Sequence, residues 1–97
     1  MELINKPEVT PLKFGDSFKT LQINGLAGTQ MPEHHSTKEA VIVVQEGQAL
    51  LKMGNSNHNL KKGSVFIIPA ANNHSLKIIE DFKAVAIMAN NSEIKFI

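Results

Sequence analysis

Short runs of apolar residues, many of them β-branched and most closed by glycine, proline or asparagine, repeat along this 97-residue chain. The clearest run is 40–45 (AVIVVQ), where valine and isoleucine fill four consecutive positions. β-Branched side chains favour extended backbone, and no segment shows a 3.6-residue apolar repeat with caps. The segment 54–57 (GNSN) is typical of a hairpin turn because glycine and asparagine tolerate a positive φ. The pattern predicts an all-β chain of short antiparallel strands.

We expect about eight strands, and their spacing of roughly ten residues is typical of a β-sandwich or barrel. The expected strands are 18–24, 40–45, 48–53, 58–62, 64–69, 74–79, 82–89 and 94–96. A turn at 46–47 is expected to separate the second strand from the third. Residues 1–15 contain two prolines and little pattern, so we expect an extended arm that wraps the body or adds an edge strand to a partner. Residues 16–97 are expected to form one barrel domain.

Charge and composition exclude several classes of function. A net charge of +1 does not indicate the strongly basic surface that binds nucleic acid. Cysteine is absent, which excludes disulfides and thiolate metal sites. No stretch approaches the ~18 consecutive apolar residues of a membrane span, and the first twenty residues lack the apolar core of a signal peptide. We therefore expect a cytoplasmic protein that binds neither nucleic acid nor membranes.

Two stretches are related by the spacing of glycine, histidine and proline. The first runs Gly28, five residues, His34, one residue, Ser36, three residues, Ala40, six residues, Gly47. The second runs Gly63, five residues, Pro69, one residue, Ala71, two residues, His74. This spacing resembles the paired motifs of the cupin superfamily, small β-barrels that often hold a metal on three histidines and one glutamate. The resemblance covers roughly residues 25–88. Over this range the chain is similar to very small bacterial cupins of the RmlC-like type, which implies a single-domain jelly-roll barrel.

The resemblance implies that His34 and His74 are the retained ligand positions of an incomplete metal site. Ser36 replaces the family's second histidine, and Ala40 replaces its glutamate. Protein sites normally supply three or four ligands, so two imidazoles would hold a divalent ion such as Zn²⁺, Ni²⁺, Fe²⁺ or Mn²⁺ only weakly. The metal would be possible but loosely bound.

Alternation of side chains along a strand assigns these candidates to faces. His74 lies on the side opposite Lys77, which favours water, so His74 is expected to point into the barrel. His35 and Glu39 are the alternative metal ligands. Each is one residue out of register with a family position, so only a β-bulge would turn it inward.

We expect a small apolar pocket at the mouth of the barrel, with His34 and His74 as its polar groups and Ser36 and Phe66 as further ligand-binding residues. The interior is expected to consist of Ile42, Val44, Leu51, Phe66, Ile68 and Leu76. The favoured function is binding of a small polar or anionic molecule. One alternative is a metal-dependent oxygenase, isomerase or decarboxylase. Another is a structural or regulatory homodimer with a vestigial pocket.

A homodimer is also expected on general grounds. The core of a 97-residue barrel is small, and open sheet edges invite pairing with a second chain. The arm from residue 3 to residue 14 would supply apolar contacts through Leu3, Ile4, Val9, Leu12 and Phe14.

Overall fold

The structure, a computed structural model, describes residues 6–97 and contains, over that range, eight β-strands and no helix. The strands are β1 (Glu8–Phe14), β2 (Phe18–Gly25), β3 (Gln30–Ser36), β4 (Ala40–Met53), β5 (Ser56–Lys61), β6 (Val65–Ile68), β7 (His74–Ala89) and β8 (Ile94–Phe96). The all-β class is therefore confirmed. A helix long and apolar enough to cross a membrane is not found within this range.

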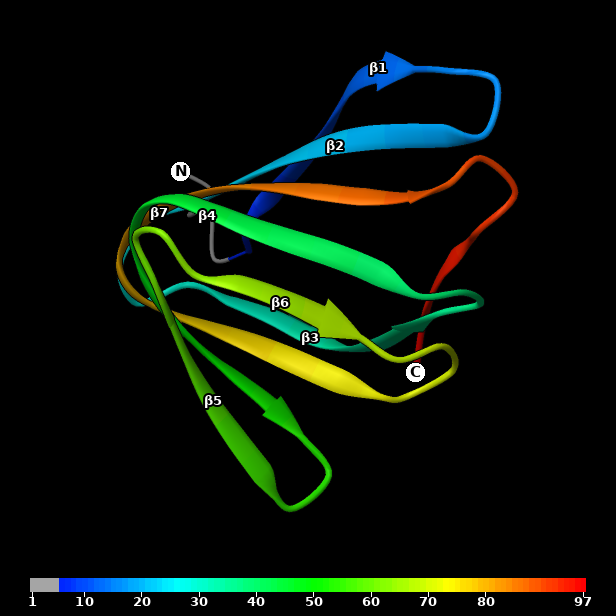
Figure 1. Cartoon of the computed structure of the whole chain (residues 1–97). Helices are drawn as coiled ribbons and strands as arrows, with labels where there is room; N and C mark the ends of the chain where they lie inside the picture. Colours follow the sequence, from blue (N-terminus) through cyan, green and yellow to red (C-terminus); the bar gives the residue numbers. More distant parts are fainter. Residues whose placement is uncertain (1–5) are drawn as a thin grey trace, which may run out of the picture.

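All strand pairs are antiparallel, and the sheet curls round until it encloses a core (Figure 1). One path of neighbours runs β1, β2, β7, β3, β8. β4 lies outside this path and pairs with β5, β6 and β7. The two long strands β4 and β7 run side by side over most of their length and join the two halves of the barrel. This arrangement confirms the predicted jelly-roll barrel.

Each long strand combines two of the strands predicted from the sequence. The expected turn at 46–47 is wrong, because β4 continues through it with shifts of register between Val44 and Ala49. Gly47 has φ +79, and a Cβ on it would overlap the backbone of Asp81 in β7. The glycine thus lets β4 bulge and bend tightly over β7 without leaving the sheet.

Burial alternates along the first part of β4, as the pleat of a strand requires. Ala40, Ile42 and Val44 are buried, whereas Val41 and Val43 lie half-buried on the outer face. The predicted interior is confirmed: the core includes Ile42, Val44, Leu51, Ile68 and Leu76, with Phe66 half-buried against it.

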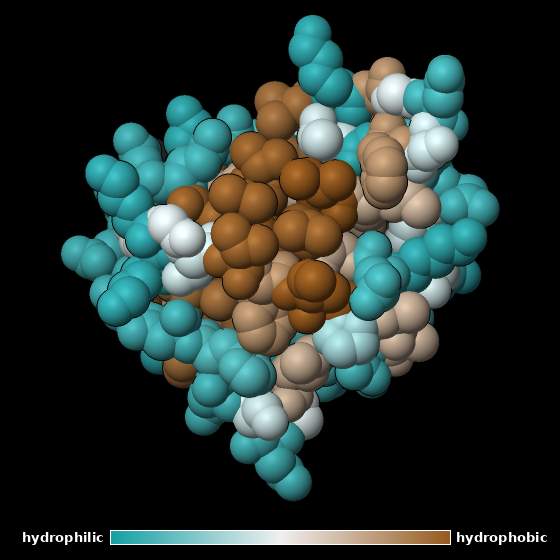
Figure 2. All heavy atoms as spheres, in the orientation of Figure 1, coloured by the Kyte–Doolittle hydropathy of each residue, from teal (hydrophilic) through white to brown (hydrophobic). Residues whose placement is uncertain are grey.

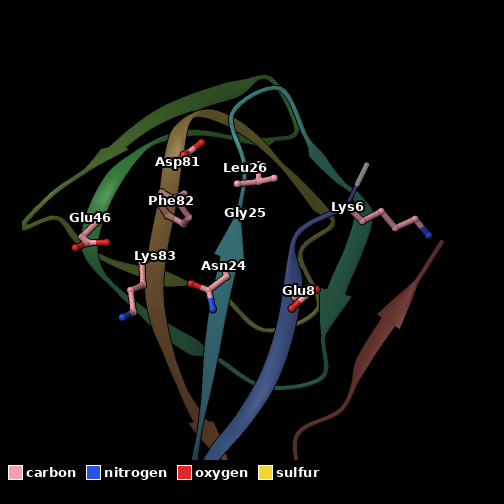
Figure 3. A pocket seen from close by; sticks show the side chains of 9 residues that line it. All are labelled: Lys6, Glu8, Asn24, Gly25, Leu26, Glu46, Asp81, Phe82 and Lys83. Carbon is pink, nitrogen blue, oxygen red and sulfur yellow. The ribbon is translucent and has the colours of Figure 1, made fainter. Parts of the chain in front are cut away.

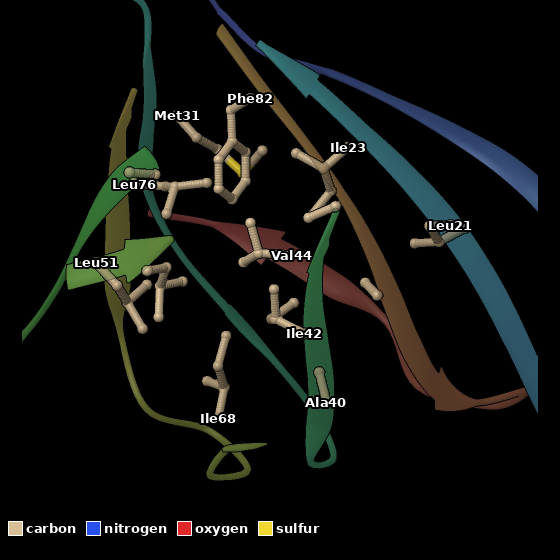
Figure 4. Close-up of a cluster of buried hydrophobic side chains, with 14 of the residues drawn as sticks. Leu21, Ile23, Met31, Ala40, Ile42, Val44, Leu51, Ile68, Leu76 and Phe82 are labelled. Carbon is tan, nitrogen blue, oxygen red and sulfur yellow. The ribbon is translucent and has the colours of Figure 1, made fainter. Parts of the chain in front are cut away.

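Figure 4 shows Met31 and Phe82 at one end of this core and Ala40 and Ile68 at the other. All four side chains are buried. The core therefore extends along the barrel axis, and the functional candidates can be placed relative to its two ends.

The arm expected at residues 1–15 is only partly described. Residues 8–14 form β1, whose side chains are all exposed and which pairs with β2 of the same chain. Val9, Leu12 and Phe14 are among the exposed apolar side chains of the molecule. Leu3 and Ile4 lie outside the described residues, so their contacts stay a prediction.

Candidate functional site

His34 on β3 and His74 on β7 lie directly opposite each other in the sheet. Both side chains point into the barrel and are buried, with 6% and 4% of their surface exposed. Their ring centroids are 4.2 Å apart, and the rings meet edge to face at 63°. The two histidines that the motifs single out therefore form one pair.

Each ring is held by a backbone carbonyl two residues earlier in the chain. His34 Nδ1 lies 2.7 Å from the Pro32 oxygen, and His74 Nδ1 lies 2.9 Å from the Asn72 oxygen. A carbonyl oxygen can only accept, so each Nδ1 must carry the hydrogen and donate it. In a neutral imidazole the other nitrogen, Nε2, then presents a lone pair.

Burial keeps both rings neutral. Desolvation lowers the pKa of His34 and of His74 below the ordinary 6.5, and the carbonyl hydrogen bonds only partly oppose it. Repulsion from His74 and His35 lowers the pKa of His34 further, and repulsion from His35 does the same for His74. Near pH 7 the pair therefore offers two hydrogen-bond acceptors and no positive charge.

Two small cavities, of about 40 and 50 Å³, adjoin the pair. Both are lined by His34 and His74, and they share the apolar wall residues Ile23, Met31, Ile42 and Ile68. The close-up of the core shows these apolar side chains projecting between the strands (Figure 4). Each cavity has room for a few water-sized groups, so the site suits a very small ligand or one end of a larger one.

Ser36 and Ala40, the positions where the family has its other two ligands, line the 50 Å³ cavity with the histidine pair. Both are buried. The four positions thus meet as the motif spacing predicts, but they supply two imidazoles, one hydroxyl and one methyl group.

This donor set does not fit a conventional divalent metal site. Such sites take three or four nitrogen, carboxylate or thiolate ligands from the protein. Within residues 6–97 no group of three or more histidine, cysteine, aspartate or glutamate side chains converges.

The alternative ligands do not join the pair. Alternation along β3 puts His35 on the other face, where it pairs in register with Lys95 of β8. Its Nδ1 is buried without a hydrogen-bond partner. Glu39 is exposed. The irregularity in β3 falls between Met31 and His34, before these residues, so no bulge turns them inward.

Phe66 is not brought to the pair either. It packs beside His58 of β5, with ring centroids 4.7 Å apart, and it lines neither cavity. The aromatic ring that does lie beside the pair, that of Phe96, is not predicted from the sequence. Phe96 of β8 lies opposite His34 in the sheet, with its ring centroid 5.1 Å away.

A larger hollow of about 330 Å³ contains no histidine (Figure 3). Its charged lining groups are Lys6, Lys83, Glu8, Glu46 and Asp81. Figure 3 shows these charged side chains pointing in different directions rather than converging on one point. The hollow therefore lacks the convergent polar groups that mark a binding site.

Comparison with known proteins agrees with the fold. A family profile described as a cupin domain matches residues 24–90. No curated protein matches the chain.

Several solved structures are similar in shape but distant in sequence. An uncharacterised double-stranded β-helix protein from Klebsiella pneumoniae has a TM-score of 0.85 at 18% identity, covering 99% of this chain and 83% of that one. KdgF from Halomonas has a TM-score of 0.77 at 13% identity, covering 92% and 83%. The DMSP lyase DddQ from Ruegeria pomeroyi has a TM-score of 0.80 at 19% identity, covering 89% of this chain but 48% of the lyase. From the profile match and the barrel together, this chain belongs to the cupin family.

Proposed function

We propose that this cupin domain binds a small, mainly apolar molecule through a hydrogen-bond donor that reaches His34 and His74. The observation that supports it is the state of the two rings. Each Nδ1 donates to a backbone carbonyl, and the hydrogen bonds found for the rings within residues 6–97 use no Nε2. Both rings line the two small cavities, so a molecule that enters there can place a donor on these acceptors.

Because the two rings are uncharged near pH 7, they favour a neutral hydrogen-bond donor over an anion as the ligand. Neutral rings whose N–H groups are already used have no donor for an anion, so the anionic ligand considered from the sequence is disfavoured. An N–H or O–H group suits the pair better. Ser36 can add one hydrogen bond, since its hydroxyl both donates and accepts.

A pair of isosteric probes tests this proposal. Pyrrole and furan have nearly the same size and shape, but only pyrrole has an N–H donor. We expect pyrrole to shift the imidazole ¹⁵N signals of His34 and His74 in NMR titrations and furan to shift them far less. Equal responses to both probes, or a pyrrole response that leaves both imidazoles unchanged, would contradict the proposal.

Single alanine substitutions test whether pyrrole binds at the histidine pair. His34→Ala and His74→Ala should each abolish the difference between pyrrole and furan. His58→Ala is the matched control, because His58 lines neither cavity. If His58→Ala removes the difference as fully as the other two variants, the ligand binds elsewhere.

A metal-dependent enzyme is the second candidate, favoured by one observation. Imidazoles that bind metals through Nε2 commonly donate Nδ1–H to a carbonyl, as both rings do here. Only two such ligands are present, so we propose at most weak and partial occupancy by a divalent ion. Elemental analysis of untagged protein purified without added metal tests this, and a stoichiometric ion that survives chelation would favour the enzyme.

A further inference from the structure

The curled sheet forms two layers, and its edge strands lie on two sides of the barrel. One layer consists of β1, β2, residues 82–89 of β7, residues 40–44 of β4, and β6. The other consists of β8, β3, residues 74–77 of β7, residues 48–53 of β4, and β5. Since β2 and β3 pair with one edge of β7 and β4 with its other edge, β1 and β8 lie on one side and β5 and β6 on the opposite side. Within residues 6–97 no strand pairing joins β1 to β8 or β5 to β6.

The side formed by β5 and β6 is covered by a pair of rings. His58 of β5 and Phe66 of β6 are half-buried, and their ring centroids are 4.7 Å apart. The 40 Å³ cavity reaches Leu60 and Ile68 on these two strands, and every residue in its lining is buried. The two rings and this buried lining therefore separate the histidine pair from water on this side.

The side formed by β1 and β8 is different, because there the 50 Å³ cavity reaches the surface. Val9 of β1 and Ile94 of β8 both line this cavity, yet they are 41% and 39% exposed. All the other residues that line it are buried. The way from water to the histidine pair therefore passes Val9 and Ile94, which we call the entrance residues.

The register of the sheet directs both entrance residues toward the cavity. Val9 lies opposite Ile23 on β2, and Ile94 lies opposite Ser36 on β3. Ile23 and Ser36 are buried and line the same cavity. Residues directly opposite each other on paired strands point to the same face of a sheet. The entrance residues therefore border the cavity from its two layers, one on each side of the gap between β1 and β8.

We propose that the gap between β1 and β8 is the entrance to the histidine pair, and that Val9 and Ile94 select a ligand with a narrow apolar tail. This proposal rests on the function proposed above, because the donor group of the ligand must pass the entrance residues to reach His34 and His74. Both entrance side chains are branched and have no hydrogen-bonding group, so the part of the ligand that stays between them is favoured when it is apolar. The expected ligand class is an unbranched chain with one terminal O–H or N–H group, such as a primary alcohol.

A second apolar area on the molecule provides a control position. Figure 2 shows this area in brown, over the region where β4 and β6 face the viewer. Val65 on β6 is 65% exposed and lines neither cavity beside the histidine pair. A bulky group attached at Val65 is therefore on the surface but not in the entrance.

Labelled cysteine variants test the entrance. The chain has no cysteine, so Val9→Cys, Ile94→Cys and Val65→Cys each provide one site for N-phenylmaleimide. The methyl signals of Ile42, which lines both cavities, report the arrival of pyrrole in NMR relaxation experiments. Labels at Val9 and Ile94 should slow binding and release of pyrrole by the same factor, at least about tenfold, because an obstacle raises the barrier without changing the end states. The label at Val65 should change neither rate.

The outcomes separate this proposal from the proposed function. Rates that are unchanged by the labels at Val9 and Ile94, or slowed equally by the label at Val65, would overturn the entrance. If pyrrole and furan bind equally well but both are slowed by the labels at Val9 and Ile94, the entrance is supported and the need for a donor is wrong. If neither probe shifts the Ile42 signals of the unlabelled chain, both proposals are overturned.

Chain length tests the apolar tail. We expect n-hexanol to bind at least about tenfold more tightly than n-propanol, because its additional CH₂ groups leave water. Val9→Ser with Ile94→Ser should remove most of this preference, whereas Val65→Ser should retain it. Equal affinity of the wild type for the two alcohols, or a preference that the double variant retains in full, would overturn the selection of a tail by the entrance residues.

Discussion

At the scale of single residues, the backbone fixes the chemistry of the histidine pair. Pro32 and Asn72 accept the Nδ1 hydrogens of His34 and His74, so both Nε2 atoms are left as acceptors. The apolar walls keep the rings neutral, which excludes the ionic recognition that two exposed histidines could provide.

This neutrality predicts how stability depends on pH. The pKa of each ring is lowered from 6.5 in the folded state, so the unfolded chain binds protons first as pH falls. The free energy of unfolding should therefore be highest above pH 6.5 and should decrease progressively below it. Urea denaturation between about pH 7.5 and about pH 5, a range that brackets the ordinary histidine pKa, measures this dependence.

A double variant provides the comparison. His34→Gln with His74→Gln should lose most of the dependence, whereas His58→Gln controls for removal of a histidine elsewhere. An unchanged slope in the double variant would show that other groups cause the dependence.

The family positions also predict a designed metal site. Ser36→His with Ala40→Glu would add two ligands that line the same cavity as His34 and His74. We expect the affinity for Zn²⁺, measured by calorimetry, to rise by at least roughly tenfold, since four ligands complete a tetrahedral site. Thr37→His is the control, because it adds a histidine one residue out of register. An equal gain in both variants would show that the cavity positions have no special geometry.

The motif spacing predicts that four side chains converge inside the barrel, but it does not predict which other side chains lie beside them. His34, Ser36, Ala40 and His74 converge because spacing along a pleated strand determines which side chains point inward. Phe96 lies opposite His34 because β8 pairs with β3, although the two residues are more than sixty positions apart in the sequence. Spacing within a motif cannot reveal such a pairing.

At the scale of elements, the bend in β4 is the most specific feature. Gly47→Ala should destabilise the fold by more than about 3 kcal/mol, because it combines a positive φ with overlap on the backbone of Asp81. Gly54→Ala is the control, since Gly54 has φ +60 but open space around it. It should cost only about 1 kcal/mol. Urea denaturation measures both, and equal costs would mean that the close approach to β7 does not matter.

The sequence predicts strands where β-branched residues cluster and misses them elsewhere. The sequence pattern does not predict β3, because its sequence, QMPEHHS, is mostly polar, yet pairing with β7 and β8 holds it in the sheet. The same pattern predicts two strands in place of β4, because a glycine within a strand and a glycine in a turn look alike in sequence.

At the scale of the whole molecule, part of the arm expected from the sequence belongs to the barrel of its own chain. Residues 8–14 form β1, which pairs with β2 of the same chain. Deleting residues 1–11 should therefore lower the melting temperature, because it removes much of β1 and uncovers the edge of β2. Light scattering on wild type and variant measures whether the arm also holds two chains together, as expected from the sequence. A dimeric wild type that becomes a folded monomer after the deletion would assign the contact to the arm, and an unchanged melting temperature would contradict the stabilising role of β1.

The state of the histidine pair can be measured most directly by long-range ¹H–¹⁵N NMR at pH 7. For both His34 and His74 we predict a protonated Nδ1 and an Nε2 with the shift of an unprotonated, acceptor nitrogen. An Nε2–H tautomer or an imidazolium at either position would contradict the account, because the barrel would then present a donor and not a pair of acceptors to the proposed ligand.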